Sequence, residues 1–246
     1  MILEKLKPTL KRKLYSNWCY IWLILPGITI LPFQLLFLLN KKTHYIAHQL
    51  YRVWAWIMLP MCFLPVTVIN KNKKLPKNGV YCINHTSYLD IPTLYRSIPG
   101  FFSIVGKKEI TGMPLIGYVF KRLYISVDRT SLESKRQTLS KCKQALKSGR
   151  PMAIFPEGRI NSAVSPNLSP FQDGAFIMAI DQQLPIIPIT IPYNWIILPG
   201  NQRYLKQGHI KAIIHEPIET LGLTISDVND LKEKVYQVID TELKKY

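Results

Sequence analysis

Two long apolar blocks dominate the first quarter of the chain. Residues 18–39 carry no charge over 22 positions, and about 20 apolar residues are enough for a helix to cross a bilayer. Residues 53–69 form a shorter block that Pro60 and Pro65 interrupt. Neither block has the small-residue cleavage site of a signal peptide. The pattern predicts a hydrophobic, helical membrane-docking segment that stays on the mature protein.

Basic residues flank both apolar blocks. Lysines and arginines precede the first block and lysines follow the second: Lys5, Lys7, Lys11, Arg12 and Lys13, then Lys71, Lys73, Lys74 and Lys77. The positive-inside rule therefore places both ends on the cytoplasmic face, as a hairpin or as two helices in one leaflet. Three cations between the blocks, Lys41, Lys42 and Arg52, would be buried at the tip of a hairpin. They favour the in-plane arrangement.

Short apolar stretches alternate with helical patterns after residue 65. The expected strands are residues 79–84, 101–105, 123–127, 152–155 and 186–191, with 209–216 at the sheet edge, and the "VTVI" of residues 66–69 alternates like a strand. The expected helices begin near Asp90, at a capping box of Thr130 and Glu133, at Gly174, and near Val228. This order predicts an α/β fold with a mixed, largely parallel sheet covered by helices on both faces.

The charge balance points to an anionic partner. The 246 residues include 32 Lys and Arg against 15 Asp and Glu, a formal charge of +17, and 48% are hydrophobic. A nucleic acid and a membrane both fit this sign. Because the aromatic residues cluster in the N-terminal apolar blocks and not among the cations, we expect membrane lipids as partners and no nucleic acid.

No metal site is expected from the sequence. His44 and His48 lie four positions apart, but no third ligand is nearby, so both are assigned to an interfacial helix. The four cysteines show no C-x-x-C spacing and are interpreted as free thiols in a reducing compartment.

A histidine and an aspartate follow the predicted strand at residues 79–84. In "NHTSYLD", Asp90 lies five positions after His85, and a turn between strand and helix can return the carboxylate to the imidazole. The carboxylate would then set the tautomer of a general base. No G-x-S-x-G motif occurs, and Ser87 can be explained as a helix cap. A base without an enzyme nucleophile indicates that a substrate hydroxyl attacks an activated acyl group directly.

A second polar loop follows the strand at residues 152–155. "FPEGRI" offers Glu157, which can orient an arginine or a substrate hydroxyl, and Gly158, which lets a ligand approach the backbone. Arg159 has the planar fork that suits a phosphate or carboxylate. Lys107 and Arg129 also follow predicted strands. Sites in such sheets gather beyond the carboxyl ends of strands, so these residues are the predicted substrate-binding set.

Four blocks together resemble the glycerolipid acyltransferases typified by lysophosphatidate acyltransferase. They are "NHTSYLD", "GYVFKRLYISVDR", "FPEGR" and "LPIIPI", and the stretch "GKKEITGMPLIG" is also similar. The resemblance implies His85 as base, Asp90 as its partner, and Arg129 on the acceptor phosphate. It divides the chain into a membrane-docking part, residues 1–64, and an acyltransferase domain, residues 65–246.

The resemblance implies a membrane-bound enzyme that needs no metal or cofactor, and the flanking charges place its domain on the cytoplasmic face. The donor would be acyl-CoA or an acyl carrier protein, and the acceptor a lysophospholipid, above all 1-acylglycerol-3-phosphate. One departure concerns the third block, where Arg159 stands in a threonine position and Ile160 in the usual arginine position. Acylation of a lyso-amino-acid lipid, such as an ornithine or glycine lipid, is therefore an alternative within the same chemistry. A non-catalytic basic membrane-binding protein is the alternative outside it.

Overall fold

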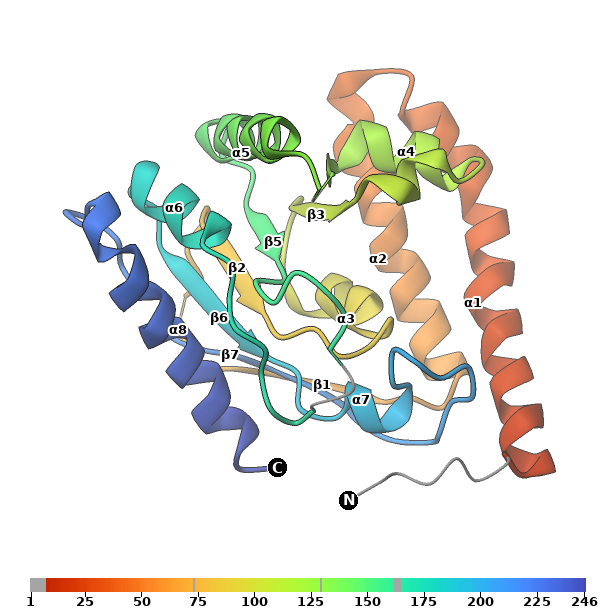
Figure 1. The fold of residues 1–246 in the computed structure, drawn as a ribbon. Helices are drawn as coiled ribbons and strands as arrows, with labels where there is room; N and C mark the ends of the chain where they lie inside the picture. The colour runs from red at the N-terminus through yellow and green to blue at the C-terminus, as the bar shows by residue number, and fades with distance from the viewer. Residues whose placement is uncertain (1–7, 73, 129, 162–164) are drawn as a thin grey trace.

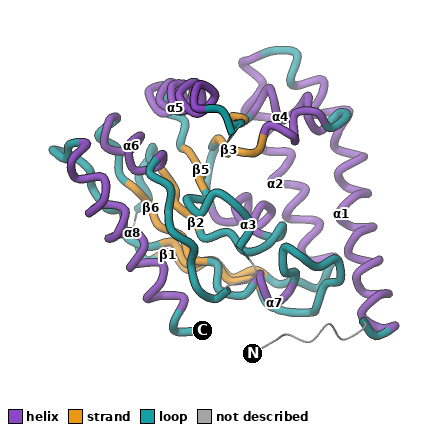
Figure 2. The backbone as a smooth tube through the Cα atoms, in the orientation of Figure 1, coloured by secondary structure: helices purple, strands orange, loops and turns teal. Residues whose placement is uncertain are grey.

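The fold is a single seven-stranded sheet with helices on both faces (Figure 1). The computed structural model describes residues 8–72, 74–128, 130–161 and 165–246. The strands are β1 (Val66–Asn70), β2 (Val80–Ile83), β3 (Ser103–Lys107), β4 (Ile125–Val127), β5 (Met152–Ile154), β6 (Ile186–Thr190) and β7 (Ile210–Ile214). Figure 2 shows these strands as a central layer between helices.

The helices follow the alternation predicted after residue 65, with two more at the N-terminus. The α-helices are α1 (Leu10–Phe37), α2 (His44–Met61), α3 (Asp90–Ser97), α4 (Ile116–Leu123), α5 (Leu132–Lys147), α6 (Gly174–Asp181), α7 (Asn194–Ile197) and α8 (Val228–Leu243). Short 3₁₀ helices are η1 (Lys41–Thr43), η2 (Lys108–Gly112) and η3 (Ile225–Asp227). The mixed, mostly parallel sheet confirms the predicted fold class.

The strand order is β1-β7-β6-β2-β5-β3-β4. All neighbouring pairs are parallel except β6 and β7, which are antiparallel. Five strands, β6, β2, β5, β3 and β4, therefore run in one direction and end at the same edge of the sheet. We call this edge the carboxyl edge. Loops that follow these strands are brought together there, as in other open α/β sheets.

Two expectations about local structure were wrong. The stretch at residues 209–216 was expected at the sheet edge, but β7 lies between β1 and β6, and β1 takes the edge by pairing in parallel with β7. The cap of α5 is Ser131, whose Oγ accepts a hydrogen bond from Ser134 N at 3.1 Å. Thr130 instead binds the carboxylate of Asp128, so the N-cap lies one residue later than predicted and the predicted Thr130–Glu133 capping box is not formed.

The central strand β2 contributes side chains to two hydrophobic cores, because its side chains alternate between the faces of the sheet. Val80 and Cys82 pack in a cluster with residues of α5, α6 and α8. Tyr81 and Ile83 pack in a second cluster with residues of α2, α3 and α4. All four side chains are buried, which is the pattern of a strand covered on both sides.

The two N-terminal helices pack against each other and against the sheet domain. Trp54 Nε1 of α2 donates to Leu23 O of α1 at 3.0 Å. At its start, α1 is attached to the segment before β7: the Arg12 guanidinium donates to Tyr204 O and Leu205 O, and Ser16 Oγ accepts from Leu205 N. Among the described helices, α1 is long and apolar enough to cross a bilayer. Only 11% of its most apolar 18-residue stretch is buried within the protein.

His48 joins α2 to the sheet domain. It is fully buried among Tyr95, Phe101, Phe102 and Tyr124, and its Nδ1 lies 3.2 Å from Tyr124 Oη. Burial, with the nearby positive charge of Arg52, lowers the pKa of the imidazole from 6.5 to about 3. The folded protein therefore holds this side chain in its neutral form.

A depressed histidine pKa predicts a defined pH dependence of stability. Between pH 6.5 and about 3 the unfolded chain binds a proton at this position and the folded chain does not, so the free energy of unfolding falls as the pH is lowered through that window. We expect His48→Phe to make the free energy of unfolding less dependent on pH in this window, by the contribution of about one proton. Denaturant titrations across the window, in mild detergent, measure it. Equal slopes in both proteins would contradict the assignment.

Candidate functional site

The loop after β2, residues 84–89, carries the predicted base at the carboxyl edge. Asn84 is fully buried and ties this loop to the end of β6: its side chain accepts from Ile191 N at 2.7 Å and donates to Ile191 O at 3.0 Å. The loop then turns into α3, which begins at Asp90. The position of His85 is therefore set by two adjacent strands.

The His85 and Asp90 side chains are directly hydrogen-bonded. Nδ1 of His85 lies 2.8 Å from Oδ2 of Asp90, and the side chains are 14% and 0% exposed. The same Oδ2 accepts from Thr86 N at 2.8 Å and Ser87 N at 2.9 Å. Because a carboxylate can only accept, it fixes the proton of the imidazole on Nδ1 and leaves the lone pair on Nε2. No hydrogen bond joins Nε2 to any residue that the structure describes.

The loop after β5, residues 155–161, lies against the His85 loop. Oε1 of Glu157 accepts from His85 N at 2.8 Å, and Oε2 accepts from Asn161 Nδ2 at 3.0 Å and Ser169 N at 2.9 Å. Burial raises the pKa of this carboxyl above its usual range, although the three hydrogen bonds and His85 oppose the shift. The carboxylate holds the two loops together, and no ion pair joins it to a cation among the described residues.

Two further features of the same loop shape the site. The His85 imidazole stacks on Phe155 with ring centroids 3.8 Å apart and planes at 17°, which limits rotation of the imidazole. Gly158 has a φ of +72°, a conformation that other residues adopt only with strain. Its N donates to Phe155 O at 3.0 Å and closes the turn.

Ser87 has a structural position. Its Oγ donates to Leu198 O at 2.6 Å and accepts from Leu89 N at 3.0 Å, and the side chain is fully buried. The N-cap of α3 is Leu89, without a side-chain cap bond, so Ser87 closes the turn before the helix and the helix-cap interpretation was wrong. With its hydroxyl proton held by a carbonyl, Ser87 is not placed to act as a nucleophile activated by His85.

Three cations were predicted to bind an anion at this edge. Lys107 ends β3 and Arg159 follows β5, so both leave the sheet at the carboxyl edge, and both are exposed. Neither forms an ion pair with an acid among the described residues. Arg129 lies outside the described residues. The geometry thus leaves two basic side chains at the same edge as His85.

One residue of the site had no signal in the sequence. Asn194, at the start of α7, donates from Nδ2 to Oδ1 of Asp90 at 2.8 Å and to Thr93 Oγ1 at 3.2 Å. It is 104 positions from Asp90, and nothing in its local pattern distinguishes it from a loop asparagine. Phe155 belongs to the block "FPEGR", but its contact with His85 could not be predicted, because the stacking depends on the pairing of β2 with β5.

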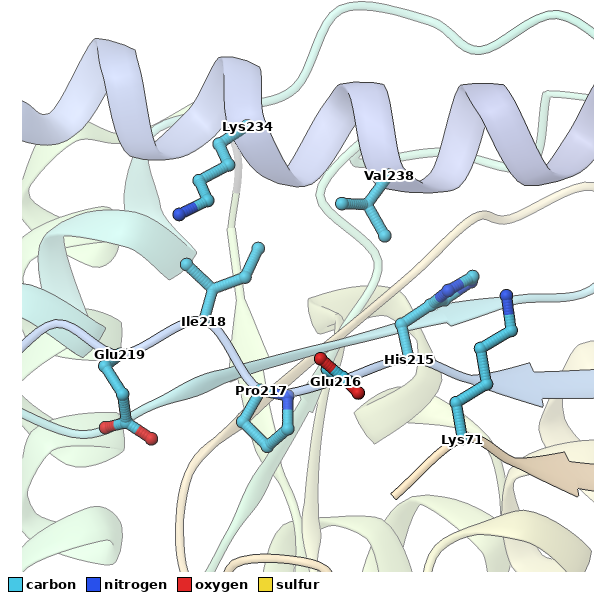
Figure 3. A pocket seen from close by; sticks show the side chains of 8 residues that line it. All are labelled: Lys71, His215, Glu216, Pro217, Ile218, Glu219, Lys234 and Val238. Atoms are coloured by element: carbon cyan, nitrogen blue, oxygen red, sulfur yellow. The ribbon is translucent and has the colours of Figure 1, made fainter.

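A separate hollow of about 560 Å³ lies between α8 and the sheet. Figure 3 shows Lys234 and Val238 of α8 above it, with Lys71 and His215 at its side. Burial and Lys71 lower the pKa of His215 to about 4, and its Nε2 is 2.8 Å from Thr190 Oγ1. Since the hollow contains none of the residues of the His85 and Glu157 loops, we do not assign the chemistry to it.

Comparison with known proteins identifies the family of the chain. The family model described as Acyltransferase matches residues 65–192. The chain is 32% identical over 202 residues to the 1-acyl-sn-glycerol-3-phosphate acyltransferase BAT2, chloroplastic, of Brassica napus, covering 80% of this chain and 56% of that protein. It is 30% identical over 213 residues to the corresponding LPAT1, chloroplastic, of Arabidopsis thaliana, covering 85% and 58%. The chain thus spans little more than half the length of these relatives.

A solved structure shares the fold. The crystal structure of the 1-acyl-sn-glycerophosphate (LPA) acyltransferase PlsC from Thermotoga maritima matches with a TM-score of 0.78 at 18% identity, covering 95% of this chain and 97% of that one. Together with the match of the family model over about half of the chain, this confirms the resemblance inferred from the four sequence blocks. The chain belongs to the Acyltransferase family.

Proposed function

We propose that this protein is an O-acyltransferase that moves a fatty acyl group from a thioester to the free hydroxyl of 1-acylglycerol-3-phosphate, giving phosphatidate. The observation that carries the proposal is the His85–Asp90 pair, whose Nδ1–Oδ2 bond of 2.8 Å leaves Nε2 available at the carboxyl edge, in a chain of this family. The names of the relatives favour this acceptor. They do not favour the lyso-amino-acid lipid alternative.

In the proposed reaction, Nε2 of His85 takes the proton of the acceptor hydroxyl as its oxygen attacks the thioester carbonyl carbon. The negative charge of Asp90 stabilises the imidazolium that forms. The tetrahedral intermediate collapses with cleavage of the carbon–sulfur bond, and the imidazolium returns the proton to the leaving thiolate. Atoms and charge balance without a covalent enzyme intermediate, in keeping with the contacts of Ser87.

The anionic head of the acceptor is proposed to lie against Lys107 and Arg159. Both side chains are exposed and form no ion pair within the described residues. Arg159 follows β5, the neighbour of β2, and Lys107 ends β3 on the other side of β5. An arginine fork can make two parallel bonds to a phosphate. Arg129 is proposed as a third contact from the family resemblance alone. Gly158, which lies in a left-handed conformation and has no side chain, would let the backbone approach the substrate.

The donor and the location are also proposals. Acyl-CoA or an acyl carrier protein would supply the thioester as a substrate, with no metal or cofactor. We further propose that α1 and α2 lie in one leaflet and place the domain on the cytoplasmic face. The in-plane orientation is supported by the attachment of α1 to Tyr204 and Leu205 and by exposed apolar side chains along α1, such as Ile21, Leu25 and Ile28.

Substitution of the base tests the reaction. We expect His85→Ala to lower kcat by about 100- to 10,000-fold, the usual contribution of a positioned base. Purified protein is incubated with lysophosphatidate, a neutral lysolipid and a lyso-ornithine lipid, each with acyl-CoA and acyl carrier protein donors, and products are identified by mass. If the wild-type protein acylates only the ornithine lipid, that lipid replaces lysophosphatidate as the acceptor. Near-normal turnover by His85→Ala would show that His85 is not the base.

Substitution of the partner tests the role of charge. In Asp90→Asn, the side-chain carbonyl oxygen can still accept from His85 Nδ1, provided that the new amide nitrogen finds an acceptor. Asn194 can supply this acceptor by turning its own amide, because its buried Oδ1 has no hydrogen-bond partner among the described residues. The fold should survive, while loss of the negative charge lowers kcat by about 100-fold or more. Asp173→Asn, at a surface ion pair with Lys232, is the matched control. Equal turnover of Asp90→Asn and wild type would show that the charge is not used.

The anion site is tested through Arg159. Loss of a charge-assisted bond to phosphate costs about 1.5–3 kcal/mol, so Arg159→Ala should lower kcat/KM for lysophosphatidate roughly 10- to 100-fold with little change for the acyl donor. Arg159→Lys should recover only part, because lysine lacks the fork. Lys147→Ala, at the exposed end of α5, is the charge control. An unchanged kcat/KM in both Arg159 variants would exclude this phosphate contact.

A further inference from the structure

The segment that follows η2 exposes a group of apolar side chains beside the carboxyl edge. Met113, Leu115, Ile116 and Tyr118 are 49%, 55%, 49% and 39% exposed. They lie in consecutive turns of the chain that leaves the sheet at the end of β3, one of the strands that run parallel to β2. We call residues 113–118 the apolar tip. Nothing in the acyl-transfer chemistry proposed above uses these side chains.

The backbone of the apolar tip is strained at its centre. Leu115 has φ 58° and ψ −56°, and Ile116 N donates to Pro114 O at 2.6 Å across it. This is a three-residue turn with positive φ, a rare conformation for a residue other than glycine. Strain of this kind is retained mostly where function requires it. In water, the strained turn costs free energy and leaves a leucine side chain exposed. In an apolar phase, removal of that side chain from water would stabilise the same conformation.

The apolar tip leads into α4, which packs against the N-terminal helices. On the inner side of α4, Val119 and Leu123 share a hydrophobic cluster with Leu35 of α1 and Ala47 of α2, and α2 contacts α4 directly. Figure 1 shows α4 beside the upper parts of α1 and α2. Exposed apolar side chains also lie at and just after the end of α1, among them Leu36 and Leu39.

The charge around the apolar tip indicates which kind of surface the tip would bind. Residues 107–122 include four cations, Lys107, Lys108, Lys121 and Arg122, and one acid, Glu109. All four cations are exposed. Apolar side chains at the centre of a basic rim match the boundary between the head groups and the acyl chains of an anionic bilayer. A protein partner of similar size would not require the rim to be basic.

We propose that the apolar tip is a second lipid contact, which inserts into the head-group boundary of an anionic bilayer separately from α1 and α2. Two separated contacts fix the tilt of the domain, so that the carboxyl edge with His85 faces the lipid surface and a lipid hydroxyl can reach Nε2. The contact depends on exposure, charge and backbone geometry. It can be tested without any assumption about catalysis.

A fluorescent probe at the tip tests the contact directly. The full-length Leu115→Cys variant is labelled with an environment-sensitive nitrobenzoxadiazole group, since the four native cysteines are buried. Leu221→Cys, at a position 80% exposed before α8, is the matched control. On phosphatidylcholine–phosphatidylglycerol vesicles with brominated acyl chains, the probe at 115 should shift to the blue and be quenched, and the probe at 221 should not.

Two results would overturn the proposal. One is an unquenched probe at 115 on protein that floats with the vesicles. The other is a blue shift at 115 that depends on protein concentration and not on brominated lipid, which would indicate a second copy of the chain as the partner.

Relief of the strained turn gives an independent readout. Glycine adopts positive φ without steric strain, which offsets its larger loss of backbone entropy on folding. Leu115→Gly should therefore keep or raise the thermal midpoint while it weakens vesicle partitioning at limiting lipid by about tenfold. Leu221→Gly should leave partitioning unchanged. A lower thermal midpoint with unchanged partitioning in Leu115→Gly would show that Leu115 serves the fold and would contradict the lipid contact.

Discussion

The buried carboxylate of Asp90 is the interaction on which the site depends. A charge removed from water must be matched by donors in good geometry, and four converge on it: two backbone N–H groups of the His85 loop, the His85 imidazole and the Asn194 amide. Three of these donors belong to the loop after β2, and the fourth belongs to α7. The loop after β2, the start of α3 and the start of α7 are all held by one side chain.

A second buried carboxylate extends this arrangement to the neighbouring strand. Glu157 binds the backbone of His85 through one oxygen and the Asn161 side chain and Ser169 N through the other. With Phe155 stacked against the imidazole, His85 is restrained on two sides and open at Nε2. Because a base must be held close to the productive geometry to be effective, these supports are as necessary to the proposed chemistry as the imidazole itself.

Features that follow from local pattern were predictable, and features that depend on distant pairing were not. The apolar "VYCI" of β2 and the polar turn after it place His85 and Asp90 at a strand end, and the structure brings them within 2.8 Å. The inner position of β7 depends on a pairing with β1, more than 140 residues earlier. Asn194 reaches Asp90 only through tertiary packing. The turn at Leu115 contradicts local preference, since nothing in "MPLIG" requires a positive φ at leucine.

The proposed mechanism requires one particular tautomer of His85, and nitrogen NMR measures the tautomer directly. In protein labelled with ¹⁵N at histidine, with the signal assigned by its loss in a His85 variant, the neutral imidazole should show a protonated Nδ1 and an unprotonated Nε2. The Nδ1 proton should be shifted downfield by its bond to the Asp90 carboxylate. An imidazole protonated at Nε2 would have no lone pair facing the substrate, and it would contradict the assignment of His85 as the base.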